Sequence, residues 1–272
     1  MPEGHTIHRL ARDHATWFGG KAVRVSSPQG RFSDGAALLD GAALEGTDAY
    51  GKHLFHRYDG GLTVHVHLGL FGRFFTHRSA PPPDPRETTR YRVAGDGHTI
   101  DLVGATACDL LADDEVEALI ARLGPDPIRD DADPDRAWAA LQRRRTPIAR
   151  ALLDQTVLAG VGNVYRAEVL FVHGIHPDVA ANLITRDEWE SIWATLVTWL
   201  RRGVRERRII TVDPREVGTP RGRLNRSQAT YVYRSERCLR CDEPVRRYDL
   251  AGRWAYACET CQPPPRRDGS RR

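Results

Sequence analysis

Hydrophobic positions change their spacing twice along the chain. Residues 3–17 carry apolar side chains at helical spacing and end at Gly19-Gly20, which predicts an N-terminal helix. The spacing then becomes two, and residues 62–68 alternate apolar and polar side chains without interruption. Short strands with short turns predict an antiparallel β-sandwich or barrel. The other predicted strands are residues 21–27, 51–58, 73–78, 90–95 and 98–104.

The helical spacing returns from about residue 111. Asp133-Pro134 is typical of an N-cap followed by a first-turn proline, and Thr185 with Glu188 forms a capping box. Residues 205–228 are rich in arginine and are expected to form a long loop after one short strand. The predicted helices are residues 112–124, 134–141, 146–160, 164–174 and a long helix that begins after Thr185.

Four cysteines near the C-terminus have the spacing of a metal site. They form two C-x-x-C pairs separated by 16 residues: Cys238, Cys241, Cys258 and Cys261. This spacing is typical of one structural Zn²⁺, because four thiolates complete its tetrahedron and leave no position open for catalysis. Alternation on both sides of residues 251–253 predicts a β-hairpin with Arg253 at its tip. The fifth cysteine, Cys108, is expected to be a buried small hydrophobic residue.

Composition and charge narrow the class of protein. The chain has 272 residues, of which 40% are hydrophobic and 28% charged, an ordinary composition for a protein with a sizeable core. No apolar run approaches the ~20 residues that cross a membrane, and the N-terminus lacks the apolar segment of a signal peptide. The net charge of +4 is compatible with a polyanionic partner. Only Lys21 and Lys52 are lysines among 40 basic residues, and lysine, unlike arginine, can lose its proton.

Several motifs together resemble one known family. They are PEG at residues 2–4, GKHLFH at 51–56, LLDQTVLAGVGNVYRAEVLFVHGIHP at 152–177, and the terminal four-cysteine hairpin. In this order they resemble the Fpg/Nei family of bifunctional DNA glycosylases along nearly the whole chain, and the Nei (endonuclease VIII-like) branch in particular. The resemblance implies a multidomain α+β fold. Its parts are an N-terminal antiparallel β-sandwich with an N-terminal helix, a helix–two-turn–helix domain and a zinc-finger β-hairpin, with DNA between the two halves.

The resemblance implies that Pro2 is the nucleophile. Once Met1 is removed, Pro2 carries a secondary amine, and α-amino groups titrate near pH ~8, far below lysine. Attack on the anomeric carbon expels the damaged base and leaves an iminium, which is the electron sink for strand cleavage by β/δ-elimination. Glu3 matches the family's acid/base residue. Lys52 matches the lysine of the GK motif, which would contact the phosphate beside the lesion and assist proton transfer.

Three further residues match DNA-contacting positions of the family. Arg253 corresponds to the finger-tip arginine, whose planar fork would clamp the phosphates that flank the lesion and so take part in catalysis. Asn163 corresponds to the phosphate-binding asparagine, at a helix start where free N–H groups can bind a phosphate. Arg122 lies in a segment that fits the family's R-x-G-P-D pattern.

The damaged base must leave the stack before the amine can reach its sugar. Residues 67–72, HLGLFG, resemble the family's wedge loop, so Leu70 and Phe71 are expected to fill the gap. Residues 100–111 lack the Arg and Phe with which the Fpg branch fills the same void, which favours the Nei branch and oxidised pyrimidines. An Fpg-like enzyme for oxidised purines, a catalytically inactive damaged-DNA-binding protein and a zinc-ribbon RNA-binding protein are the alternatives.

The resemblance also predicts domains and partners. The expected parts are a catalytic β-sandwich (1–111), a linker (112–133), a helix–two-turn–helix domain with its loop (134–228), a zinc finger (229–262) and a disordered basic tail (263–272). The expected partner is damaged double-stranded DNA, with bubble or single-stranded DNA as further substrates. A cytoplasmic, nucleoid-associated monomer without membrane contact is expected.

Overall fold

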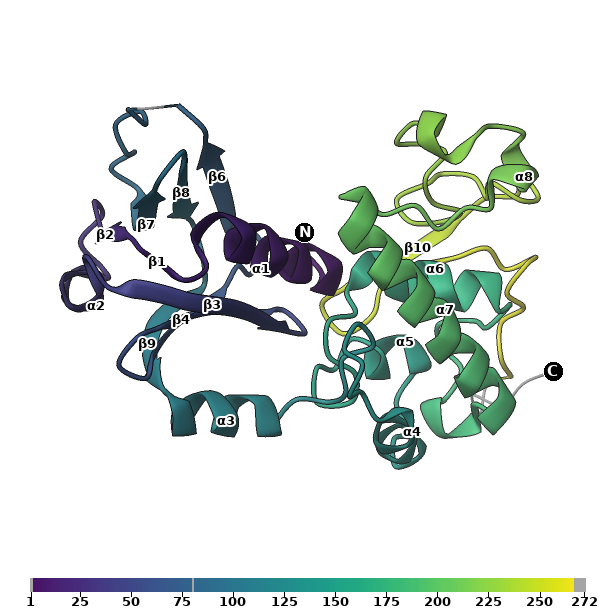
Figure 1. Cartoon of the computed structure of the whole chain (residues 1–272). Helices are drawn as coiled ribbons and strands as arrows, with labels where there is room; N and C mark the ends of the chain where they lie inside the picture. The colour runs from purple at the N-terminus through teal and green to yellow at the C-terminus, as the bar shows by residue number, and fades with distance from the viewer. Residues whose placement is uncertain (1, 80, 267–272) are drawn as a thin grey trace. The chain divides into compact units, whose positions relative to one another are not determined.

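The protein is described by a computed structural model that places residues 2–79 and 81–266. The chain divides into two compact units, residues 1–122 (unit 1) and 123–272 (unit 2) (Figure 1). The predicted basic tail lies partly outside the described residues, since it includes 267–272.

Unit 1 is built on two antiparallel sheets. One sheet has the strand order β1-β3-β4-β5-β9 and the other has the order β2-β7-β8-β6. A single apolar core contains side chains of both sheets, so the β-sandwich predicted from the alternation is confirmed. The strands are β1 (Lys21–Ala22), β2 (Arg24–Ser26), β3 (Ala43–Tyr50), β4 (His53–Tyr58), β5 (Leu62–His67), β6 (Arg73–His77), β7 (Thr89–Gly95), β8 (His98–Val103) and β9 (Ala107–Ala112).

Three helices accompany these sheets. Helix α1 (Gly4–Phe18) buries Ile7, Leu10 and Phe18 in the sandwich core, which confirms the predicted N-terminal helix. Helix α2 (Ser33–Leu39) and helix α3 (Asp113–Ala121) complete unit 1. The hydrophobic pattern of the sequence did not predict α2, β3 or β9. Strand β3 lacks a regular alternation of apolar and polar residues, because a register shift between Leu44 and Gly46 interrupts it.

Unit 2 is mainly helical around an apolar core, and a second apolar cluster lies behind its C-terminal hairpin. Asp133 caps α4 through hydrogen bonds from the backbone N–H groups of Asp135 and Arg136, as its sequence predicted. Thr185 and Glu188 form the predicted capping box at the start of α7. The helices are α4 (Pro134–Gln142), α5 (Ile148–Ala151), α6 (Asn163–Val172), α7 (Arg186–Glu206) and α8 (Pro214–Val217), with 3₁₀ turns η1 (Ala181–Leu183) and η2 (Arg221–Arg223).

Two predictions in unit 2 are wrong. The helix expected over residues 146–160 stops at Ala151. Beyond it, Asp154 accepts hydrogen bonds from the backbone N–H and hydroxyl of Thr156, an alternative to helical bonding that short polar side chains offer. The strand expected within residues 205–228 is not found in that described segment, which instead contains α8 and η2.

The C-terminal part of unit 2 contains a β-hairpin. Strand β10 (Arg246–Asp249) pairs antiparallel with β11 (Trp254–Ala257), which confirms the predicted hairpin. The connection is fixed by hydrogen bonds between Leu250 and Arg253 in both directions, and Ala251 and Gly252 adopt positive φ angles of 54° and 77°. Within residues 2–79 and 81–266, no helix is long and apolar enough to span a membrane.

Candidate functional site

At the start of unit 1 a proline is followed directly by a buried acid. Pro2 is half-buried and immediately precedes α1, and Glu3 occupies the N-cap position with its residue surface 0% exposed. The Glu3 carbonyl accepts a hydrogen bond of 2.8 Å from the Thr6 N–H. A carboxyl group in this place is withdrawn from water and lies at the positive end of a helix. Such a carboxyl group can donate a proton to, or accept a proton from, a reaction that takes place at the neighbouring residue.

Lys52 lies in a turn, not in the strand that its sequence suggested. Tyr50 and His53 are paired across β3 and β4, so Gly51 and Lys52 form a two-residue connection in which Gly51 has a φ of 58°. The Lys52 side chain is half-buried. The turn holds this lysine at one end of the five-stranded sheet.

A group of histidines lies next to Lys52. His53 Nδ1 is 2.9 Å from His65 Nε2, and the ring centroids of His53 and His67 are 5.0 Å apart. Burial, followed by the nearby His65, His67, Lys52 and Arg122, lowers the pKa of His53 to about 3. The structure therefore brings Lys52 and Arg122 into the same charged neighbourhood within unit 1. His56 points the other way and hydrogen-bonds His14 inside the core.

The loop after β5 presents two apolar side chains to solvent. Leu70 is 51% exposed and Phe71 is 80% exposed, so neither belongs to the core. A side chain at Gly69 would collide with the Thr106 hydroxyl, and one at Gly72 would collide with the Leu68 carbonyl. The loop is therefore closely fitted to its surroundings while its apolar tip is accessible.

Asn163 and the finger tip meet within unit 2. Asn163 is the first residue of α6, and its Nδ2 donates a 3.2 Å hydrogen bond to the backbone carbonyl of Trp254. Arg253, the preceding residue, is exposed at the tip of the hairpin. Residues 91 positions apart in the sequence thus bring the start of α6 next to the backbone of the finger tip. An amide and a helix N-terminus beside a tip that carries an exposed arginine are a combination suited to phosphate.

Two buried charged residues of α6, which the sequence reading missed, hold this arrangement. Arg166 donates to Asn163 Oδ1 and, over 2.6 Å, to the Trp254 carbonyl. Glu168 is 0% exposed and accepts hydrogen bonds from the backbone N–H groups of residues 231, 232 and 233 and from the Thr211 hydroxyl. The sequence could have indicated their role, because they are the two charged side chains in the otherwise apolar segment VYRAEVLFV.

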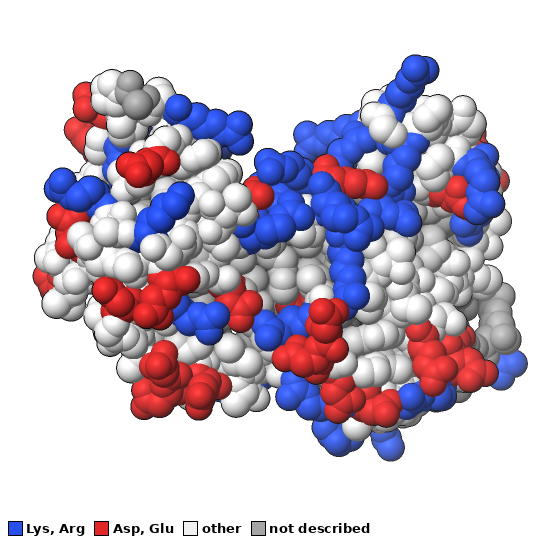
Figure 2. Space-filling view, viewed as in Figure 1, with Lys and Arg blue, Asp and Glu red and all other residues white. Residues whose placement is uncertain are grey.

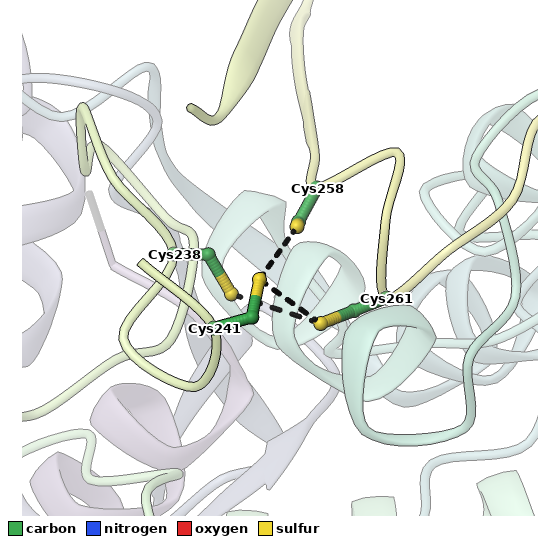
Figure 3. Close-up of side chains that lie close together, drawn as sticks. All are labelled: Cys238, Cys241, Cys258 and Cys261. Carbon is green, nitrogen blue, oxygen red and sulfur yellow. Dashed lines mark hydrogen bonds between the residues drawn. The ribbon is translucent and has the colours of Figure 1, made fainter. Parts of the chain in front are cut away.

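The four C-terminal cysteines converge on one point (Figure 3). Their Sγ atoms lie within 4.8 Å of one another, and the Cys241–Cys258, Cys241–Cys261 and Cys238–Cys261 distances are 3.4, 3.5 and 3.9 Å. A tetrahedral ion with metal–sulfur bonds of ~2.3 Å needs sulfur–sulfur distances of about 3.8 Å. The sulfur cage therefore fits a metal ion, and this is the one such group of His, Cys, Asp or Glu among the residues described.

Positive charge is concentrated on unit 2. Figure 2 shows basic side chains gathered over the C-terminal end of α7 and the segment that follows it. Arg208 is fixed there by hydrogen bonds to the carbonyls of Leu224 and Arg221. The arginines of this segment are Arg201, Arg202, Arg205, Arg207 and Arg208. Such a surface attracts a phosphate-rich partner.

Comparison with known proteins identifies similar chains and folds. Residues 1–105 match the formamidopyrimidine-DNA glycosylase N-terminal domain, and residues 123–213 match the formamidopyrimidine-DNA glycosylase H2TH domain. Endonuclease 8 1 of Mycobacterium bovis is 47% identical over 96% of this chain and 100% of its own length. Formamidopyrimidine-DNA glycosylase of Salinispora arenicola is 31% identical over 98% of each chain.

Solved structures share the fold. The MutM (Fpg) protein of Thermus thermophilus is 26% identical and superimposes with a TM-score of 0.76, over 96% of this chain and 98% of that one. MutM in complex with carbocyclic 8-oxo-G containing DNA is 22% identical with a TM-score of 0.78, over 96% and 100% of the two chains. The family matches, the relatives and the arrangement of the residues agree, and the chain belongs to the Fpg/Nei family of bifunctional DNA glycosylase/AP lyases, which act in base excision repair.

Proposed function

We propose that the chain removes oxidised bases, chiefly pyrimidines, from DNA through a covalent intermediate on Pro2. The amine nitrogen of Pro2 attacks C1′ and loses its proton, and the bond between C1′ and the base breaks with its electrons leaving on the base, which takes up a proton. The nitrogen lone pair then breaks the C1′–O4′ bond, so the sugar ring opens and O4′ takes up a proton. The resulting cationic iminium draws electrons from the sugar. Loss of a C2′ proton then expels the 3′ phosphate, and a second elimination expels the 5′ phosphate, which gives the β/δ products.

The observation that carries this proposal is the burial of Glu3 directly beside Pro2 at the head of α1. A carboxyl group held beside the proposed nucleophile can act as a general acid and as a general base. We assign to Glu3 the donation of a proton to the opening sugar ring and the later removal of a proton from C2′. Lys52, half-buried in its turn, is proposed to contact the phosphate beside the lesion and to assist these transfers.

We propose that the remaining site residues bind DNA. Asn163 and Arg253 bind the phosphates that flank the lesion, and the hydrogen bond from Asn163 to the backbone of Trp254, the residue after Arg253, supports this role. Arg122 contributes a further phosphate contact. Leu70 and Phe71 enter the gap left by the extruded base, and the exposure of both side chains supports the wedge role.

We propose that the four-cysteine site holds one structural Zn²⁺. The sulfur-only donor set suits zinc, and four thiolates leave no position for substrate. Bound zinc would supply no catalytic step here. It would fix the hairpin that carries Arg253, held by Cys238, Cys241, Cys258 and Cys261. The proposed working parts are residues 1–111, 112–133, 134–228 and 229–262. We further propose a monomer that works on nucleoid DNA in the cytoplasm and accepts duplex, bubble and single-stranded substrates.

Borohydride trapping tests the covalent step. Incubated with an oligonucleotide containing an abasic site, the protein should form a stable adduct, and mass spectrometry of the digested adduct should place the sugar on the nitrogen of residue 2. Pro2→Gly should lower base removal strongly. Glu3→Gln should bind DNA normally and lose turnover. Attachment to any other residue, or full turnover by Glu3→Gln, contradicts the proposal.

A panel of oligonucleotides, each with one defined lesion, tests the substrate class. Oxidised pyrimidines should be released faster than oxidised purines. The reverse order indicates an Fpg-like preference. Binding to every member of the panel without release or crosslinking indicates a damaged-DNA-binding protein without catalysis.

A further inference from the structure

Trp254 is unusually accessible for a tryptophan of this chain. Its residue surface is 49% exposed, whereas Trp189 and Trp199 are 0% and 9% exposed. The other three tryptophans are half-buried. A tryptophan that only stabilised the hairpin would lie in the apolar cluster behind it, as Tyr256 does. The exposed indole is therefore available to contact a ligand or partner.

The surroundings of Trp254 indicate what that ligand is. The residue follows Arg253, and its backbone carbonyl accepts hydrogen bonds from Asn163 and Arg166. The backbone of Trp254 is thus bonded to Asn163 and adjoins Arg253, the two residues proposed to bind the phosphates beside the lesion. We expect the base of a nucleotide held by these residues to lie near the Trp254 side chain.

Arg247 fixes the orientation of the ring. Asp249 pairs with Trp254 across the hairpin, so Arg247 lies diagonally opposite the tryptophan. Its guanidinium carbon is 4.4 Å from the ring centroid, a cation–π contact. The contact leaves about half of the residue accessible and places a positive charge beside an aromatic surface. Basic grooves combined with exposed aromatic rings are typical of proteins that bind unpaired nucleic acid.

We propose that Trp254 is a stacking platform for one unpaired base next to the lesion, and that it makes the enzyme efficient on single-stranded and bubble DNA. This inference rests on the proposed function. In a duplex both faces of every base are covered by its neighbours, so an indole can stack only on a base that has left the helix. Trp254 therefore acts on the choice of substrate rather than on the chemical step.

Binding of a tetrahydrofuran-containing oligonucleotide tests the platform, because this abasic analogue cannot be cleaved. Trp254→Ala should weaken binding to the single strand and to a bubble about 5- to 150-fold, the range expected for one stacked base. Binding to the matched duplex should change less than twofold. Trp254→Phe, which keeps an aromatic face, should recover most of the affinity. One metal ion per chain in each variant would show that the hairpin is intact.

Fluorescence supplies a second readout, since a stacked base quenches indole emission. Single-stranded DNA should quench the wild-type protein more than Trp254→Phe. The matched control is Trp193→Phe, which removes a half-buried tryptophan of α7 and should leave the quenching unchanged. Unaltered single-strand affinity in Trp254→Ala, or an equal loss on duplex and single strand, overturns the platform. If borohydride traps no adduct of the wild-type protein, the covalent mechanism is overturned instead. The binding measurements described above can still be interpreted in that case.

Discussion

Each unit buries a hydrogen-bonded network of a different kind. In unit 1 one buried network consists of uncharged groups: His14 Nδ1 lies 2.9 Å from His56 Nε2, His56 Nδ1 lies 3.0 Å from the Tyr91 hydroxyl, and that hydroxyl lies 2.6 Å from the Tyr58 hydroxyl. Burial lowers the pKa of His56 to about 3 and raises the pKa of Tyr91. This chain of hydrogen bonds is maintained only while its histidines carry no charge.

Unit 2 instead buries groups that are charged in water. Arg166 is 1% exposed and Glu168 is 0% exposed, and both bond mainly to backbone groups. Burial raises the pKa of Glu168 in spite of four hydrogen bonds that lower it. The four cysteines add a site that can hold a metal ion. We therefore expect the stability of unit 1 to respond to pH, and that of unit 2 to respond to metal binding and to the hydrogen bonds of two buried side chains.

Removal of the metal should have the largest effect. Cys241→Ser, or a strong chelator, should unfold the hairpin and abolish DNA binding, because the free energy of structural zinc binding, about 10–16 kcal/mol, is folding free energy in such modules. Metal analysis and DNA affinity measure this. Cys108→Ala, which changes a buried cysteine of unit 1, is the control and should keep one metal per chain. Unchanged DNA affinity in a metal-free protein would remove the hairpin from the binding site.

Loss of the buried acid should come next. Glu168→Leu should lower the free energy of unfolding of unit 2 by about 3–5 kcal/mol, because several buried N–H groups lose their acceptor. Glu168→Gln keeps one acceptor oxygen and should cost less. Urea unfolding measures both. As a control, Glu190→Gln changes an exposed helix residue that is paired with Arg186 and should shift stability by less than about 1 kcal/mol. Equal stability of Glu168→Leu and wild type would contradict the bridging role of Glu168.

Acid should weaken unit 1. An unfolded histidine titrates near pH ~6.5, whereas the folded pKa of His56 is about 3. The stability of the neutral core is therefore fully present above pH ~6.5 and is lost as pH falls below it, by up to about 1.4 kcal/mol per pH unit for each such histidine. Urea unfolding at pH 7.5 and 5.5, with pulsed hydrogen exchange to report each unit, measures this. His56→Gln cannot take up that proton and should show a shallower slope; an identical slope would contradict the assignment.

The exposed loop of residues 67–72, which we propose to act as the wedge, should matter least for stability. Phe71→Ala should change the free energy of unfolding by less than about 0.5 kcal/mol, because the side chain is 80% exposed. Leu68→Ala, in the same loop but 3% exposed, should cost about 2–5 kcal/mol. The rate of base release should show the opposite order of effects. Phe71→Ala should release the base more slowly than wild type, and Leu68→Ala should be affected less. A large stability loss in Phe71→Ala would place this residue in a structural role.

Local signals in the sequence were accurate where a short segment decides its own structure. The alternation of residues 62–68 predicted β5, and Thr185 with Glu188 marked the start of α7. The cysteine spacing predicted the hairpin and its metal-binding pattern, because the geometry of four thiolates around one ion admits few chain paths. The helix expected through residue 160 was wrong because Asp154 offers the backbone a competing hydrogen bond.

The sequence by itself determined the change from strands to helices along the chain, the adjacent Pro2 and Glu3, and the spacing of the four thiols, since each of these depends on residue type and spacing. Tertiary structure alone decided that Asn163 meets Trp254 across 91 residues, that Lys52 and Arg122 share the surroundings of His53, and that Leu70 and Phe71 face solvent. The physical reason is that burial and long-range contact are properties of the packed chain. A residue's neighbours in space, and not its neighbours in sequence, set both.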